Sequence, residues 1–335
     1  MHKIVSIGEV MMRLSPPGKQ RLRQARGFEI LYSGSEANVT AALALWGWNT
    51  CHVTCFPDNP LGMAARSALM QTGMDTRYVQ LKGSRLGLYF VENGAMGRPS
   101  AITYDRLPSA FSEAGAGNYP WKEILQDARW FHWSGITPAL SQDAADSLAE
   151  ALEVCHANGI TVSADINYRT GLWRYGKEPG DVMEPLVAKS HVVVASEHDT
   201  GRLFGIAPQS GEPTHASIAR QLMQRFPTIT DVIGSWRNPV SAEHNQLGGL
   251  LWNASGFYQS PTHELLHIVE RIGSGDAFMA GFIHGRVKGM DGQALISFAT
   301  AAAVLKHSIE GDVLSCTLSE VEELASGKTG GHIKR

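Results

Sequence analysis

The sequence predicts an α/β fold, in which a doubly wound, mostly parallel sheet carries helices on both faces and a small β-sheet lid. Short apolar segments typical of strands alternate with helix-like segments through most of the 335 residues, the pattern of a parallel sheet covered on both faces. Residues 11–33 and 84–112 break this rhythm and are rich in Gly, Pro, Arg and aromatic residues. We therefore expect one domain over residues 1–335, with the lid formed by these two segments.

The first third of the chain supplies the start of the sheet and the lid. Residues 2–8 ("HKIVSIG") predict a buried strand, and residues 35–47 ("SEANVTAALALWG") predict a helix with Ser35 as its N-cap and Gly47 as its stop. "CHVTCF" is strand-like and "NPLGMAARSALMQTG" is helix-like. "RLGLYFVE" and "SAITYD" predict antiparallel strands of the lid.

The remaining segments continue the alternation. Strands are predicted in "ARWFHWSG", "ITVSADIN", "SHVVVASE" and "TDVIGS", and helices in "SQDAADSLAEALEVCHANG" and "HASIARQLMQRF". Ligands of such sheets bind at the carboxyl ends of the strands. In this chain those ends are Gly8–Glu9, Asp165–Asn167, Ser196–Asp199 and Gly234–Arg237.

Charge and composition exclude several classes of protein. Hydrophobic residues make up 43% and charged residues 18%, as in ordinary globular enzymes. A formal net charge of −3 argues against a nucleic-acid partner. No apolar run is long enough to cross a membrane. The N-terminus "MHKIVSIGEV" enters a strand without the features of a signal peptide, so we expect a cytoplasmic protein.

"TCHVTCF" raises the alternative of a zinc site at Cys51, His52 and Cys55. On a strand, however, the two cysteines would lie about 13 Å apart, and His52 would face the other side. We expect reduced, partly buried thiols instead.

The stretch "VERIGSGDAFMAGF" at residues 269–282 carries the strongest chemical signal. It fits neither the P-loop nor the dinucleotide fingerprint. It is a glycine-rich turn that opens a helix, and its N–H groups and positive helix end attract an oxyanion. The helix start also favours an ionised Asp276, which could take a proton from a hydroxyl beside a phosphoryl group. From these residues alone, a plain helix N-terminus with Asp276 near the cap remains open.

Two stretches together resemble the signatures of the ribokinase, or PfkB, family of carbohydrate kinases. "GSGDAFMAGF" is similar to the C-terminal signature, and "YSGSEANVTAALALWG" to the other. The resemblance covers essentially the whole chain and implies a ribokinase-like fold. Within the family, "GEVMMRLSPPG", "DINYRTGLW" and "LKHSIEGD" are most similar to the 2-keto-3-deoxygluconate kinases.

The resemblance implies a role for individual residues. Asp276 would be the catalytic base, and Gly273, Ser274 and Gly275 would form the anion hole. The sugar would be bound by Gly34, Asn38, Tyr89, Tyr104, Arg106, Arg169, Glu270 and Asp312. Chemistry agrees independently, because the planar fork of arginine binds the carboxylate of a sugar acid.

The implied cofactors are ATP and Mg²⁺. Asn167, Ser196, Ser235, Trp236 and Arg237, with Gly273 and Gly275, would flank ATP, and Asp199 would act indirectly on the metal. Three positions depart from the family pattern: Ser33 replaces a glycine, Ser196 an asparagine and Glu270 an aspartate. We expect Glu270→Asp to change activity more than Ser196→Asn.

The implied function is ATP-dependent phosphorylation of the terminal hydroxyl of a sugar acid, foremost 2-keto-3-deoxygluconate to its 6-phosphate. Two alternatives remain: a kinase of the same family for a neutral sugar or nucleoside, and a sugar-acid-binding protein with little turnover. The expected partners are the sugar acid and ATP, with a homo-oligomer formed through the lid because exposed sheet edges invite pairing.

Overall fold

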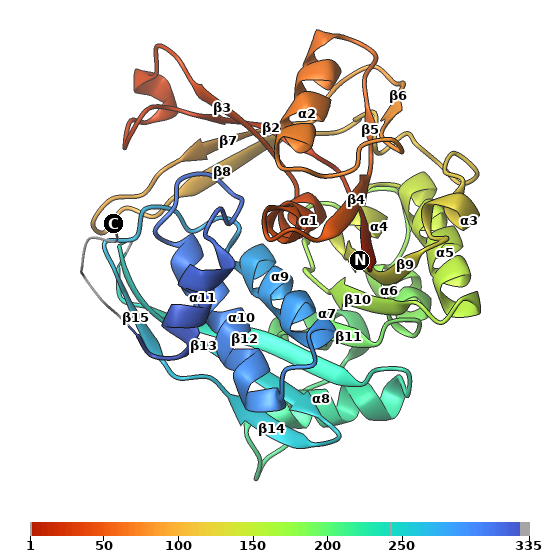
Figure 1. The fold of residues 1–335 in the computed structure, drawn as a ribbon. Helices are drawn as coiled ribbons and strands as arrows, with labels where there is room; N and C mark the ends of the chain where they lie inside the picture. The colour runs from red at the N-terminus through yellow and green to blue at the C-terminus, as the bar shows by residue number, and fades with distance from the viewer. Residues whose placement is uncertain (1, 242, 329–335) are drawn as a thin grey trace.

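The computed structural model describes residues 2–241 and 243–328. A sheet of nine strands crosses this part of the chain (Figure 1). Six strands pair in parallel, namely β4 (Asn49–Val53), β1 (Lys3–Ile7), β9 (Ala128–Ser134), β10 (Thr161–Asp165), β11 (Val192–Val194) and β12 (Asp231–Pro239). The expected mostly parallel sheet is therefore confirmed.

One edge of the sheet is antiparallel. β13 (His244–Asn253) pairs with β12, and β14 (Gly256–Gln259) and β15 (His263–Leu266) both pair with β13. The sequence analysis assigned no strand to these residues. Because β12 runs on to Pro239 and pairs with β13 over its whole length, this edge forms a long hairpin rather than another strand–helix unit.

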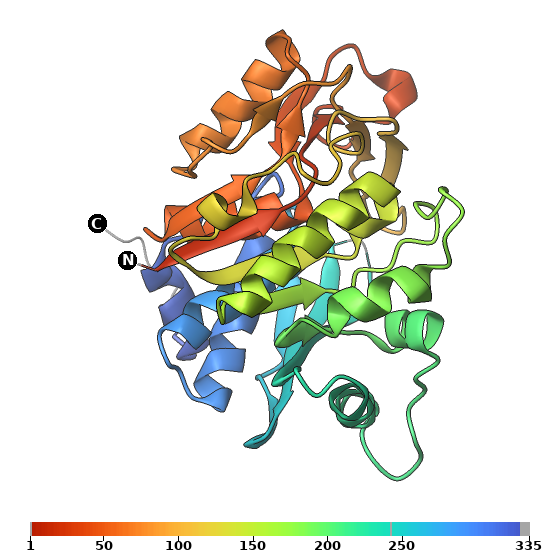
Figure 2. The ribbon, with the colours of Figure 1, turned by 90° about the vertical axis from the view of Figure 1, so that its right-hand side faces the viewer.

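Helices cover both faces of the sheet (Figures 1 and 2). One face carries α1 (Ser35–Leu45), α9 (Ser274–Val287), α10 (Gly292–Lys306) and α11 (Leu318–Ala325). The other carries α5 (Gln142–Ala157), α6 (Pro179–Val187), α7 (Glu197–Phe204) and α8 (Thr214–Arg225), with the short α3 (Trp121–Ile124) and α4 (Ile136–Leu140) nearby. The alternation of β1 divides the core, since Ile4 packs on the first face and Val5 and Ile7 on the second.

A separate sheet of four strands projects from this body (Figure 1). Its order is β3 (Glu29–Ser33), β2 (Met11–Ser15), β7 (Leu88–Glu92) and β8 (Ala101–Asp105). The two predicted strands of residues 84–112 do pair antiparallel, as β7 and β8. The 3₁₀ helix η1 (Leu22–Gln24) lies between β2 and β3, while α2 (Pro60–Gln71), β5 (Cys55–Phe56) and β6 (Gln80–Leu81) pack at the base of this sheet.

The start of α1 differs from the expectation. Gly34, not Ser35, is the N-cap, and Ser35 is the first helical residue. The hydroxyl of Ser35 donates to the carboxylate of Asp276 at 2.9 Å instead of capping its own helix. A long-range hydrogen bond thus overrides the local capping preference.

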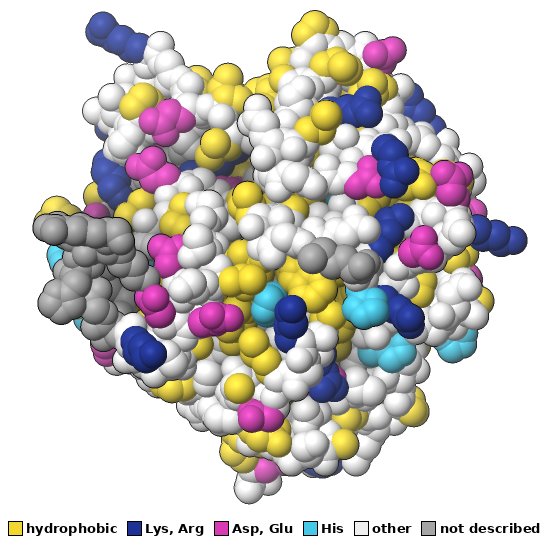
Figure 3. Space-filling model, in the orientation of Figure 1, with side chains coloured by type: hydrophobic (Ala, Val, Ile, Leu, Met, Phe, Trp, Pro, Cys, Tyr) yellow, Lys and Arg dark blue, Asp and Glu magenta, His cyan; other side chains and the backbone are white. Residues whose placement is uncertain are grey.

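The surface and the cysteines complete the description. On the face shown in Figure 3, side chains of both charges are interspersed, and hydrophobic side chains gather near the centre. No helix in residues 2–241 or 243–328 is long and apolar enough to cross a membrane. Cys51, Cys55 and Cys155 are free and buried, and burial raises the pKa of the Cys51 and Cys155 thiols to about 12.

Candidate active site

A cavity of about 390 Å³ lies where the parallel strands end and the small sheet overhangs the body. Because the carboxyl ends of these strands meet at one edge, side chains distant in sequence gather there. The cavity brings together most of the predicted residues, namely Gly34, Asn38, Tyr89, Tyr104, Arg106, Asn167, Arg169, Asp199, Arg237, Gly273, Ser274, Gly275, Asp276 and Asp312.

The turn at Gly273 requires glycine. Its φ is +82°, and a Cβ added there would lie 1.8 Å from the carbonyl oxygen of Asp312. The turn caps α9, so the N–H groups of the first helical turn are free of intrahelical partners. Arg237 donates to the hydroxyl of Ser274 at 2.8 Å, while the space beside Gly275 is open. The turn therefore presents donors to a cavity that can admit an anion.

Asp276 lies in the first turn of α9 and is held by α1. Ser35 Oγ donates to its Oδ1 at 2.9 Å, and Asn38 Nδ2 donates to its Oδ2 at 2.7 Å. Burial raises the pKa of Asp276 to about 7, with Asp312 and Glu36 adding to the rise, although the two hydrogen bonds lower it. The expectation that the helix start would favour an ionised Asp276 was therefore incomplete, since it left out desolvation, which raises the pKa of this carboxyl.

The two predicted arginines differ in their surroundings. Arg106 is 7% exposed, and its Nε donates to Glu9 Oε2 at 2.8 Å. Arg169 is exposed, and within the described ranges its guanidinium makes no hydrogen bond or ion pair, while its carbonyl oxygen accepts from the N–H of Leu172 at 3.1 Å. Glu9 therefore offsets the charge of Arg106, whereas Arg169 has no ion-pair partner in the described ranges and its charge acts on Asp165. The second oxygen of Glu9, Oε1, is buried without a partner in the described structure.

Aromatic side chains of the small sheet cover the same end. Tyr89 and Tyr104 stack with their ring centroids 6.0 Å apart, and the guanidinium of Arg106 lies 5.6 Å from the ring centroid of Tyr104. Gly34 lines the same cavity, and a Cβ added to it would be 2.0 Å from the carbonyl oxygen of Glu9. Only glycine permits this close approach of α1 to the end of β1.

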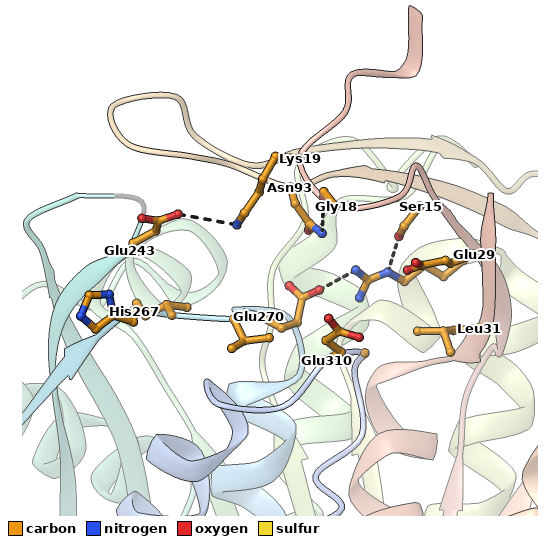
Figure 4. Close-up of a pocket in the computed structure, with 14 residues that line it drawn as sticks. Ser15, Gly18, Lys19, Glu29, Leu31, Asn93, Glu243, His267, Glu270 and Glu310 are labelled. Atoms are coloured by element: carbon orange, nitrogen blue, oxygen red, sulfur yellow. Dashed lines mark hydrogen bonds and ion pairs between the residues drawn. The ribbon is translucent and has the colours of Figure 1, made fainter. Parts of the chain in front are cut away.

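Glu270 lies outside the cavity, unlike the other predicted sugar-binding residues. Its carboxylate lines a second cavity of about 600 Å³ (Figure 4). Its Oε2 pairs with Arg13 at 2.5 Å, and its Oε1 accepts from the N–H groups of Arg271 and Ile272. The extra methylene thus lets the carboxylate fold back onto its own loop while it reaches an arginine of the small sheet.

The residues predicted to flank ATP divide into two groups. Asn167, with φ of +37°, and Arg237 line the cavity. Ser196, Ser235 and Trp236 do not, since Ser196 caps α7 by accepting from the N–H of Asp199 at 3.1 Å and the other two continue β12. Arg237 also reaches His307 Nε2 at 3.0 Å. Burial and the charge of Arg237 lower the pKa of His307 to about 4, which keeps this ring neutral and able to accept.

The acidic side chains of the cavity fit Mg²⁺ bound together with phosphates. Burial, with repulsion from Asp276 and Asp199, raises the pKa of Asp165 to about 7. Within the described ranges, no three potential ligands stand close enough to hold a metal ion by themselves. Mg²⁺ prefers one or two carboxylates, several waters and substrate phosphates, so Asp165 and Asp199 are a suitable set.

Comparison with known proteins places this geometry in a family. The pfkB family of carbohydrate kinases matches residues 1–233 and 248–316. A 2-dehydro-3-deoxygalactonokinase of Haloferax volcanii is 32% identical over 98% of each chain. The chain belongs to the PfkB family.

Solved structures agree with the assignment of this chain to the PfkB family of carbohydrate kinases. A 2-dehydro-3-deoxygluconokinase of Thermotoga maritima is 40% identical and superposes with a TM-score of 0.93, over 98% of this chain and 100% of that one. A putative ribokinase II of E. coli, solved with ATP and Mg²⁺, shares the fold at 20% identity and a TM-score of 0.81, over 98% and 100%.

Several residues of this kinase's site escaped the sequence analysis. Glu9 and Asp165 were noted only as strand ends, and Ser35 only as a cap. Arg13 and Arg271 were not singled out. A signal for Arg13 was present, because it is the charged residue of the otherwise strand-like "MMRLS" and is 2% exposed.

Proposed function

We propose that this kinase transfers the γ-phosphoryl group of ATP to the terminal hydroxyl of 2-keto-3-deoxygluconate (2-dehydro-3-deoxygluconate) or a close sugar acid, giving the 6-phosphate. The observation that carries the proposal is that one cavity holds Asp276 beside a glycine turn together with the exposed cation Arg169. A sugar acid bound between them could place a hydroxyl at Asp276 and its carboxylate at Arg169. The names of the two relatives above at 32% and 40% identity, each a kinase for a 2-dehydro-3-deoxy sugar acid, support the same substrate class.

The chain's own residues account for the proposed transfer. Asp276 takes the proton of the terminal hydroxyl, whose oxygen forms a bond to the γ-phosphorus while the bond to the β-phosphate oxygen breaks. A pKa near 7 suits this task, because the base is available near neutral pH and still accepts the proton readily. The N–H groups of Gly273, Ser274 and Gly275 face the charge on the moving phosphoryl group.

The ends of the substrate are bound by different elements. Arg169, after β10, binds the sugar carboxylate, while Arg106 is kept in orientation by Glu9 and adds to the same end. Bound Mg²⁺ would neutralise charge on the β- and γ-phosphate oxygens. Asp165 and Asp199 would hold it through waters.

The small sheet is proposed to exclude water and to join subunits. Tyr89, Ile102 and Tyr104 line the cavity from β7 and β8, where they would keep water from accepting the phosphoryl group.

The outer strands β3 and β8 are exposed, and Ile30 is 53% exposed, so we propose a homo-oligomer through these edges. Light scattering should give a multiple of 36.3 kDa, and the mass of a monomer would refute the proposed homo-oligomer.

The free buried thiols favour a reducing compartment, so we propose that the protein is cytoplasmic.

Product analysis tests the proposed reaction. The enzyme is incubated with Mg-ATP and 2-keto-3-deoxygluconate, and the product is examined by ³¹P–¹H correlation NMR. Coupling of the new phosphorus to the C6 protons is expected. Coupling to another carbon, or no phosphoester while ATP still binds, would contradict the proposal.

A further inference from the structure

A buried ion-pair network at the border of the candidate site joins the small sheet to the body. Arg13, on β2, donates through Nη2 to Glu270 Oε2 at 2.5 Å, through Nη1 to Asp312 Oδ1, and through Nε to Ser15 Oγ at 2.9 Å. Figure 4 shows Glu270 and Ser15 linked through the guanidinium between them. All three nitrogens of Arg13 are engaged, and its side chain is only 3% exposed.

Both acids that Arg13 holds touch the glycine turn. Glu270 Oε1 accepts from the N–H of Arg271 at 2.8 Å and of Ile272 at 3.2 Å, directly before Gly273. The backbone of Asp312 approaches Gly273 so closely that no Cβ fits between them. The shape of the turn is therefore set by two segments that meet on one guanidinium.

The small sheet converges on the second oxygen of Asp312. Ser33 of β3 donates to Oδ2 at 2.6 Å, and the hydroxyl of Tyr89 of β7 donates to the same atom. Arg13 and Tyr89 are direct partners in the β2–β7 register. Three strands of the small sheet thus anchor on one carboxylate, and both of its oxygens are taken up in this structure.

The network is balanced in charge only with Arg13 present. Glu270 and Asp312 are 6% and 5% exposed. Lys306, which is 0% exposed, donates to the carbonyl oxygen of Ile309 at 3.0 Å and interacts electrostatically with both acids. Two buried cations therefore face two buried anions. Removal of one cation leaves an uncompensated charge beside the turn, which is costly in a low-dielectric interior.

We propose that Arg13 is a positioning residue for phosphoryl transfer, which ties the small sheet over the sugar to the Gly273–Gly275 turn by holding Glu270 and Asp312. Hydrogen-bond donors stabilise a developing charge only when they are fixed in advance. Arg13 fixes them through both acids without touching the reacting atoms. The inference rests on the proposed kinase function. It adds a residue that connects the small sheet at the sugar to the glycine turn at the phosphoryl group.

The first test replaces Arg13 by methionine, with Arg85→Met as the matched control. Arg85 pairs with Asp105 near the surface of the same sheet and does not line the site. We expect kcat of Arg13→Met to fall about 100-fold, the size that a small misplacement produces, and Arg85→Met to match wild type. A twofold or smaller change in kcat for Arg13→Met, with an unchanged pH profile, overturns the proposal.

The pH profile separates positioning from general destabilisation. The charged groups that interact with Asp276 are Asp312, Glu36, Asp165 and Lys306. Without Arg13, the charge of Asp312 is less compensated and favours the protonated form of Asp276. The acid limb of kcat should therefore move to higher pH, by about half a unit or more. A merely less stable enzyme would keep the wild-type profile at temperatures where it is folded.

Hydrogen exchange gives a readout that needs no substrate. Peptides covering residues 269–276 should exchange faster in Arg13→Met than in wild type or Arg85→Met, because the N–H groups before Gly273 lose a fixed acceptor. If the wild-type enzyme phosphorylated no sugar acid, the proposed function would be wrong. The hydrogen-exchange comparison would still test whether Arg13 holds the turn. If Arg13→Met does not fold, Glu270→Gln replaces it, and wild-type exchange and kcat in that variant overturn the proposal.

Discussion

At the scale of the residue, the proposed chemistry depends on Asp276 as the base. Its carboxylate receives hydrogen bonds from Ser35 and Asn38, yet burial dominates and raises its pKa to about 7. Asp276→Asn keeps the size and one acceptor but cannot take the proton. We expect kcat to fall about 10²–10⁴-fold with sugar and ATP binding retained. Steady-state kinetics with a calorimetric binding control measures this, and turnover within tenfold of wild type would exclude Asp276 as the base.

The raised pKa of Asp276 also predicts how activity depends on pH. The base must be ionised, and burial favours its protonated form, so the active fraction falls as pH drops below the pKa. We expect kcat/KM to fall about tenfold per unit below pH 7 and to level off above it. A profile between pH 5.5 and 8.5 checks this. A flat profile would mean that the carboxylate has an ordinary pKa in the working enzyme.

The two arginines should respond differently to removal. Arg169→Ala loses an exposed cation, so kcat/KM for the sugar acid should fall about 10- to 100-fold while a neutral analogue changes little. Arg106→Ala also leaves Glu9 buried and unpaired, so it should lower the free energy of unfolding by about 3–5 kcal/mol as well. Kinetics with both ligands and chemical denaturation separate the two effects. Equal losses for acid and neutral ligands would remove the reason for choosing a sugar acid.

At the scale of the element, the two positions that differ from the family pattern, Glu270 and Ser196, have different structural roles. Ser196 caps α7, and asparagine is an equally good cap, so Ser196→Asn should be nearly silent. Glu270 spans from the N–H groups of its own loop to Arg13, and aspartate is too short to keep both contacts. We expect Glu270→Asp to lower kcat about tenfold or more. Mg²⁺ titrations at saturating ATP and sugar acid compare the variants, and coinciding curves would show both positions to be neutral.

Elements with local signals were predictable and those with distant partners were not. The glycine turn before α9 carries its own motif, and the alternation of strands and helices fixed the sheet and both helical layers. Capping rules misassigned Ser35, because its hydroxyl bonds Asp276 across 241 positions. The Arg13–Asp312 pair joins residues 299 positions apart, and nothing local in "MMRLS" points to that partner. The hairpin of β12 and β13 was missed because its strands follow each other without a helix.

At the scale of the whole molecule, the fold gathers the Gly273–Gly275 turn, Asp276 and Arg169 into one cavity. The parallel strands bring their ends to one edge, α9 and α1 meet at Asp276, and the small sheet lines the cavity through Tyr89, Ile102 and Tyr104. The same sheet is anchored to the turn through Arg13 and Asp312. In the proposed mechanism, binding and transfer therefore depend on two layers of the molecule that are joined by buried charges.

A substrate panel tests the central claim most directly. ADP release is measured with Mg-ATP and 2-keto-3-deoxygluconate, its galacto epimer, aldonic acids, neutral hexoses and nucleosides, with Asp276→Asn as the blank. A keto-deoxy sugar acid should give the highest kcat/KM, by about tenfold or more over any neutral sugar, since a charged contact is worth that factor. A higher kcat/KM for a neutral hexose or nucleoside, or ADP release that Asp276→Asn retains, would contradict the account.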